Sequence, residues 1–383
     1  MRLFVVTNAS SVAFGALIEI FDFGTRKSRA VVSALLYSAA MVSALFSGQP
    51  DVLFVGRAVF GLASALHHSS FEAYVVQEHG SLGFPEEWLS QTFAATTHLM
   101  SLLAFLAGLL GQTTAAAGDA PAVIVVCAAV FLAAAVYISG SWTADISSSR
   151  FLFGAFVSNL SQTLGASRRN RFLAYFLAVS ALAETALTVF SYFWAQLLSS
   201  VVSEERARLP FALIFSAYVC ASMVGAYSHG MLVSRVGSDS SFQAVLSGLV
   251  AAFSLAGMVQ TPIVIFVSSV FVYGLIGAYW PCIGTLRAKA VGAEQRAASQ
   301  FISRVSSTAL TALILIYLHH SATLTLIACA GCLAAATLAQ SMAMQQVGGL
   351  FNTIFDSFAG SDWERIRPTE KGNHRTRRVE LFC

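Results

Sequence analysis

The sequence predicts an all-α polytopic membrane protein with about eleven transmembrane helices. Of its 383 residues, 56% are hydrophobic and only 11% are charged, whereas a soluble domain has about 25% charged residues. Several long stretches contain no Asp, Glu, Lys or Arg, and the two longest, residues 240–286 and 305–355, each have room for two spans of about 20 residues. Because lipid offers no partner to an open backbone, apolar runs of this length predict helices.

Eleven apolar segments are expected to cross the membrane in succession. They cover residues 2–21, 30–48, 52–76, 90–111, 120–138, 172–198, 209–233, 241–259, 262–286, 298–318 and 321–343. Seventeen of the 22 basic residues follow the first, fifth, seventh, ninth and eleventh spans. Loops rich in Lys and Arg stay in the cytoplasm. We therefore expect a cytoplasmic C-terminus and Met1 on the opposite side. The membrane is expected to be the plasma membrane or an endomembrane.

The segment 140–171, which is rich in Ser and Arg, divides the chain and is expected to be a cytoplasmic central loop. It separates an N-terminal bundle of five spans (1–139) from a C-terminal bundle of six (172–344), and residues 345–383 form a polar cytoplasmic tail. The helical period of residues 350–358 predicts either a short helix on the membrane surface or no structure. An odd number of spans with an outside start indicates either a missing first helix or a true eleven-span protein.

The sequence carries no pattern typical of catalysis, nucleotide binding or metal binding. His67 and His68 are adjacent, so they cannot share a metal ion from one helix face. We therefore expect no enzyme activity, no cofactor and no metal site. The net charge of +3 does not indicate nucleic acid, because the basic residues lie in membrane loops. The expected partners are a small solute and the lipid bilayer, and the expected state is a monomer.

A polar stripe runs along the third expected span. Arg57, Ser64, His68 and Glu72 fall within about 80° of one another on a helix, opposite an apolar face. A charged residue at the centre of a bilayer costs about 2.5–3.5 kcal/mol on insertion scales, so such residues face a partner or a water-filled cavity. Arg57 and Glu72 are separated by about 22 Å along the helix and cannot pair with each other.

Two further spans carry charges, Glu184 in the sixth and Arg304 in the tenth. Arg57 and Arg304 offer planar groups with several donors, which suits an oxyanion. Glu72, Glu184 or His68 could take up a proton or form an ion pair. The structural alternative is an interhelical ion pair that fixes packing, for example between Arg57 and Glu184.

The ninth expected span contains a proline well inside it, which predicts a bend. Tyr273 and Trp280 share one face of this span, next to Pro281. We expect Pro281 to belong to a moving gate and the two aromatic residues to contact substrate, with simple close packing as the alternative. A further gating or packing cluster is expected after the first span, formed by Asp22, Arg26 and Lys27.

Several sequence blocks are specific enough to indicate a family. They are Phe71-Glu72-Ala73-Tyr74, Phe84-Pro85-Glu86-Glu87-Trp88, Glu184 with Phe193-Trp194, Leu209-Pro210-Phe211, and Tyr279-Trp280-Pro281 with Phe301 and Arg304. Over roughly residues 3–340 the chain resembles the molybdate-anion transporter family of the major facilitator superfamily. The resemblance implies a two-bundle carrier that moves molybdate or a similar oxyanion by alternating access. A carrier of another small solute and a non-transporting receptor or scaffold are the alternatives.

The sequence departs from this family in two places. The family's first helix is expected to have no counterpart here, and the chain is then expected to begin at the family's second helix. The superfamily's cytoplasmic Gly…Asp-x-x-Gly-Arg-Lys signature is also altered, because Asp22 stands two residues before Gly24 and Thr25 precedes Arg26-Lys27.

Overall fold

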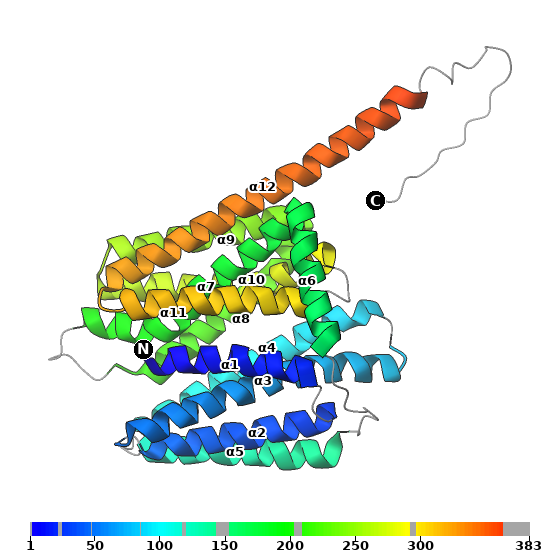
Figure 1. Ribbon diagram of the computed structural model, residues 1–383. Coiled ribbons are helices and arrows are strands. Elements are labelled where there is room, and N and C mark those ends of the chain that lie inside the picture. Colours follow the sequence, from blue (N-terminus) through cyan, green and yellow to red (C-terminus); the bar gives the residue numbers. More distant parts are fainter. Residues whose placement is uncertain are drawn as a thin grey trace, which may run out of the picture.

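The computed structural model in Figure 1 describes residues 2–21, 25–46, 48–84, 86–116, 120–142, 153–202, 209–291 and 296–362. Within these ranges the chain forms twelve α-helices, one short 3₁₀ helix and no β-strand. The helices are α1 (Arg2–Phe21), α2 (Arg26–Ser43), η1 (Ala44–Phe46), α3 (Pro50–Ser81), α4 (Glu86–Ala116), α5 (Ala120–Ser141), α6 (Phe153–Arg169), α7 (Arg171–Val201), α8 (Phe211–Val236), α9 (Ser238–Met258), α10 (Pro262–Ala290), α11 (Arg296–Tyr317) and α12 (Ala322–Asp362). The predicted all-α class is confirmed.

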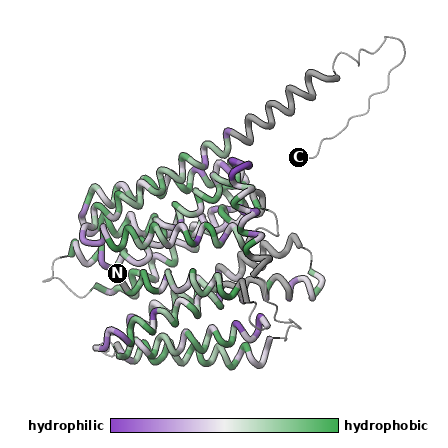
Figure 2. Tube along the Cα trace, viewed as in Figure 1, coloured by the Kyte–Doolittle hydropathy of each residue, from purple (hydrophilic) through white to green (hydrophobic). Residues whose placement is uncertain are grey.

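Each expected span coincides with one of the long helices α1–α5 and α7–α12. Among the described residues, eight helices are long and apolar enough to cross a membrane. The apolar stretches of α1 and α4 are shorter, Leu3–Ile18 and His98–Thr114, and α3 carries the polar stripe over its 32 residues. Hydrophobic residues cover the lengths of the helices, and hydrophilic residues gather mostly near their ends (Figure 2). These features establish a multi-pass membrane protein.

Two helices differ from the sequence predictions. Much of the predicted central loop 140–171 is the helix α6, which packs against α7 and α11. Ser and Arg favoured a loop, but Val157, Leu160 and Leu164 recur at helical spacing. The first part of the predicted tail is not a separate short helix, because α12 continues through it to Asp362 and projects beyond the bundle (Figure 1). No proline interrupts α12.

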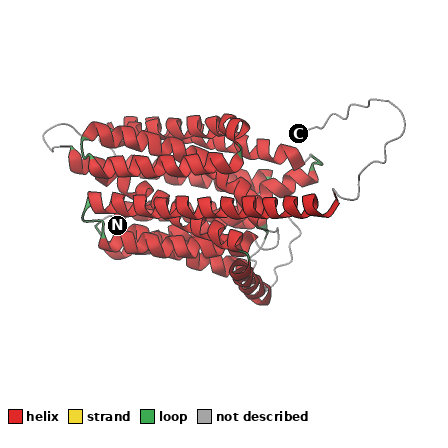
Figure 3. Ribbon diagram, turned by 90° about the horizontal axis from the view of Figure 1, so that it is seen from above, coloured by secondary structure: helices red, strands yellow, loops and turns green. Residues whose placement is uncertain are grey.

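The helices pack in two groups, one above the other in Figure 1, and the view from above in Figure 3 shows that most of them run in roughly the same direction. In the first group α3 packs on α1 and α2, and α5 packs on α2 and α4. In the second group α7 and α9 pack on α12, and α8 packs on α10. The two groups meet where α1 contacts α11 and α4 contacts α8. At the α4–α8 contact the Ser216 hydroxyl donates a 3.2 Å hydrogen bond to the Phe105 carbonyl.

A close helix approach in the second group joins α8 and α10, and glycine makes it possible. A Cβ atom on Gly225 would collide with the Gly274 carbonyl oxygen, and a Cβ atom on Gly277 would collide with the Ser222 carbonyl oxygen. Small residues at such positions let the backbones of membrane helices come together and gain van der Waals contact. This approach holds α10 firmly against α8 along the middle of both helices.

We expect Gly225→Leu to destabilise the protein by about 1–3 kcal/mol, because overpacking forces the backbone of α10 away from α8. The measurement is the apparent Tm of the purified protein in detergent. Gly230→Leu is the matched control, since the same helix offers open space there. Equal melting temperatures for the two variants would contradict the close α8–α10 contact.

Candidate functional site

The first polar cluster lies where α1 and α3 meet α7, and we call it the aromatic–arginine cluster (Phe4, Asn8, Arg57 and Tyr192). The Arg57 Cζ atom lies 5.5 Å from the centre of the Phe4 ring, a cation–π contact. The Tyr192 ring stacks on the Phe4 ring, with ring centres 4.4 Å apart. The Tyr192 hydroxyl donates a 3.2 Å hydrogen bond to Asn8 Oδ1. The two contacts of Tyr192, which involve only neutral side chains, join the two helix groups.

The second polar cluster, the acid–arginine cluster, consists of Glu184, Arg287 and Arg304 on α7, α10 and α11. The Arg287 Nη2 atom lies 3.8 Å from Glu184 Oε1 in a largely buried ion pair, with side-chain exposures of 22% and 16%. Arg304 also lies close enough to Glu184 for electrostatic interaction. Two arginines from different helices therefore share one described carboxylate.

The acid–arginine cluster extends toward the first helix group through Arg304. Arg304 lies near Tyr37 on α2, and Tyr37 in turn lies near Ser64 on α3. Ser64 and Arg304, both predicted from the sequence as substrate contacts, thus both lie near one tyrosine.

The structure separates Arg57 from Glu184. The two residues Glu184 and Tyr192 lie eight positions apart on α7, about 12 Å along its axis, and each belongs to a different cluster. The suggested Arg57–Glu184 ion pair is therefore wrong, because Glu184 pairs with Arg287 and Arg57 contacts Phe4.

The candidates on α10 have different surroundings. Tyr273 stacks on Tyr218 of α8 with ring centres 4.8 Å apart and an interplanar angle of 12°, so it is fixed by packing. Trp280 lies on the same helix face but is 53% exposed. Pro281 is inside α10, which continues without interruption from Pro262 to Ala290.

The predicted gating cluster begins at the start of α2. The Thr25 hydroxyl accepts a hydrogen bond from the Ser28 backbone N–H and caps the helix. The Lys27 Nζ atom donates a 2.8 Å hydrogen bond to the carbonyl of Trp142, which follows α5 directly, and the Trp142 ring stacks on Tyr74 of α3 at 3.7 Å. Lys27 therefore links α2, α5 and α3 at this end of the first helix group. Arg26 is the first residue of α2.

Three predicted site residues cannot be placed in either cluster. Asp22 lies outside the described residues. His68 and Glu72 belong to α3, but their side chains lie outside the described part of the structure.

Sequence reasoning missed the aromatic partners of Arg57 and also missed Arg287. It assigned Arg287 to the loop after the ninth span, but α10 extends past this residue to Ala290. A spacing signal was available: Tyr273, Trp280 and Arg287 recur every seven residues, which places them on one helix face.

Comparison with known proteins finds relatives that are named as transporters. The chain is 26% identical over 310 residues to a molybdate-anion transporter of Xenopus tropicalis, and 24% identical over 333 residues to a molybdate-anion transporter of Takifugu rubripes. The matches cover 78% and 77% of this chain. They span 66% of the length of each relative.

Solved structures agree on the fold. The nucleoside transporter NupG superposes with a TM-score of 0.62 at 14% identity, and the Escherichia coli fucose:proton symporter FucP with 0.59 at 14% identity. Each match covers 89% of both chains. The family model MFS_5, described as sugar transporters with 12 transmembrane segments, matches residues 1–282. The chain therefore belongs to this family of the major facilitator superfamily, in which its curated relatives include molybdate-anion transporters.

Proposed function

We propose that the protein is a membrane carrier that moves molybdate or a similar tetrahedral oxyanion by alternating access. The observation that carries this proposal is the excess of positive charge in the acid–arginine cluster. Arg287 pairs with Glu184 and Arg304 lies near the same carboxylate, so among the described residues one carboxylate balances only one of two guanidinium groups. An anion that enters beside them would supply the missing negative charge.

The chemistry of the arginines favours an oxyanion over a simple halide. A guanidinium presents several donors in one plane and can bind two oxygens of the same anion at once. Arg57 adds a second position of positive charge. Its guanidinium contacts the Phe4 ring, and no described carboxylate neutralises its charge. The names of the curated relatives support molybdate as the anion.

In this proposal the two helix groups, 1–139 and 172–344, rock about the solute while α6 and its flanking residues connect them on the cytoplasmic side. Arg57 and Arg304 are the anion ligands, with Ser64, Tyr273 and Trp280 around them. Glu184, together with His68 or Glu72, couples transport to a proton or an ion pair. Residues Asp22, Arg26, Lys27 and Pro281 belong to the gates, and the tail lies in the cytoplasm.

A carrier of an uncharged, sugar-like solute is the second candidate. The description of the matching family model favours it, and the half-exposed indole of Trp280 is the kind of apolar face on which a sugar ring packs. The two candidates differ in their need for positive charge, so one transport assay separates them.

We expect Arg304→Ala to lower the uptake of labelled molybdate into proteoliposomes at least tenfold, and Arg57→Ala to lower it severalfold. The reason is that losing a charge-assisted contact of about 1.5–3 kcal/mol weakens anion binding by that order. Arg169→Ala, which removes an exposed arginine at the end of α6, is the control and should transport like the wild-type protein.

Competition identifies the substrate class in the same assay. Excess unlabelled tungstate should suppress molybdate uptake, and excess glucose should not. Equal uptake by wild-type protein and Arg304→Ala would refute the oxyanion site, and uptake of a labelled sugar that is indifferent to Arg304→Ala would favour the second candidate. Purified protein that retains its melting temperature but moves neither solute would point to a receptor or scaffold.

We expect the Glu184–Arg287 pair to show a coupling free energy of about 1 kcal/mol or more in a double-mutant cycle. Each single change, Glu184→Gln or Arg287→Gln, leaves a partly buried group without its partner, whereas the double change removes both. Thermal unfolding of the four proteins in detergent measures the coupling. If the stability losses of the two single variants add up to that of the double variant, the 3.8 Å contact between Glu184 and Arg287 does not stabilise the fold.

A further inference from the structure

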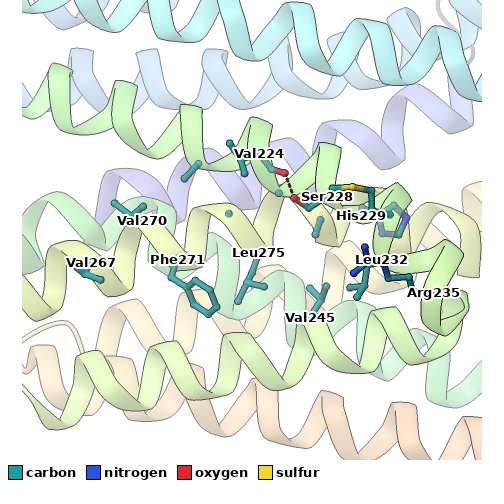
Figure 4. A pocket seen from close by; sticks show the side chains of 15 residues that line it. Val224, Ser228, His229, Leu232, Arg235, Val245, Val267, Val270, Phe271 and Leu275 are labelled. Carbon is teal, nitrogen blue, oxygen red and sulfur yellow. Dashed lines mark hydrogen bonds between the residues drawn. The ribbon is translucent and has the colours of Figure 1, made fainter.

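The second helix group holds a groove that the proposed transport does not use. It lies between α8 and α10, with Val245 of α9 at its edge, and has a volume of about 720 Å³. Figure 4 shows it running along the two helices, from Val267 at one end to Arg235 at the other. Its position on α8, α9 and α10 is separate from both polar clusters.

The groove opens toward the side of the bundle. Val224, Val267 and Phe271 on its walls are 65%, 58% and 57% exposed, and in a membrane such surfaces contact lipid. The close approach of α8 to α10 at Gly225 and Gly274 forms a shallow floor, because neither residue has a side chain to fill it. The groove is therefore an apolar surface depression that faces the hydrocarbon of the bilayer.

The length of the groove accommodates a phospholipid of one leaflet. Gly225 and Gly274 lie level with each other, Val267 lies seven residues before Gly274, and Arg235 lies ten residues after Gly225, so the groove is about 25 Å long. One leaflet with its headgroup region is about 20–22 Å thick, half of a bilayer of about 40–45 Å. An extended acyl chain of one leaflet therefore fits along the groove.

The polar residues of the lining are few. Ser228 uses its hydroxyl on the Val224 carbonyl of its own helix at 2.7 Å, and the His229 Nδ1 atom lies 3.3 Å from the Cys282 sulfur. The third polar residue of the lining, Arg235, is exposed in the last turn of α8 and forms no ion pair with a described residue. One end of an otherwise apolar groove thus carries a positive charge that is available to a ligand.

We propose that this groove binds an anionic phospholipid, with an acyl chain along α8 and α10 and the phosphate at Arg235. The groove complements such a lipid in two ways. Its apolar walls face the acyl chain of the lipid, and the Arg235 guanidinium faces the phosphate. The charge distribution predicted from the sequence places Arg235 on the cytoplasmic side, where anionic lipids concentrate and each nearby basic residue attracts them. A lipid held there would fill the space between α8, α9 and α10.

Native mass spectrometry of the full-length protein in detergent tests the proposal, with dioleoyl phosphatidylserine and dioleoyl phosphatidylcholine added separately. We expect wild-type protein to retain phosphatidylserine in preference to phosphatidylcholine. Arg235→Ala should reduce the affinity for phosphatidylserine about fivefold, the effect of one basic residue at an anionic surface, and leave phosphatidylcholine unchanged. Ser228→Phe should fill the groove and reduce the binding of both lipids.

Two control variants match these changes. Arg169→Ala removes an exposed arginine away from the groove, and Ser247→Phe adds a phenyl ring at an exposed position of α9 outside the lining. Both should bind lipid like the wild-type protein, and unchanged melting temperatures exclude misfolding of the test variants. The proposal fails if Arg235→Ala keeps the preference, or if Ser228→Phe binds like Ser247→Phe. It also fails if Ser228→Phe dissociates a dimer, which would make a second copy the occupant, or if molybdate displaces the lipid.

Discussion

The cost of placing a charge in hydrocarbon is the constraint on which this structure depends. A bilayer satisfies neither backbone groups nor ionised side chains, so the chain forms helices and collects its charges where helices can shield them. Glu184 does not face lipid; it lies among α7, α10 and α11 with Arg287 and Arg304 around it. Arg57 is covered by the Phe4 ring, whose π-face replaces part of the lost hydration. The position of the candidate site therefore follows from where charge can be tolerated.

Packing between the helices follows from the same solvent. Lipid tails are as apolar as leucine, so helices associate through close contact rather than through burial from water. At the α8–α10 interface Gly225 and Gly277 allow backbone to touch backbone. The same absence of side chains leaves the adjoining groove shallow and open to lipid. One feature of the sequence thus both joins two helices and shapes a surface beside them.

The sequence was sufficient to predict the helices but not the partners of their charges. Apolar runs and their length determine where spans lie, because that signal is local, and the helix period placed Arg57 and Ser64 on one face. Which carboxylate meets which arginine depends on contacts between spans far apart in the chain. Arg287 was missed because positive charge near a span end is read as a loop, although α10 carries it on the face of Tyr273 and Trp280. The helix α6 was missed for a similar reason, since its Ser and Arg residues outweighed a weak helical period.

The two clusters are suited to different parts of a transport cycle. The aromatic–arginine cluster joins α1 to α7 by one neutral hydrogen bond and one ring stack, each of which contributes only about 1 kcal/mol net. Contacts of this strength can form and break when the helix groups separate. The Glu184–Arg287 pair lies within a single helix group and would cost more to break, because it leaves charges buried without partners. In the proposed carrier, the first cluster is therefore the contact that opens, and the second keeps its charge in place throughout the cycle.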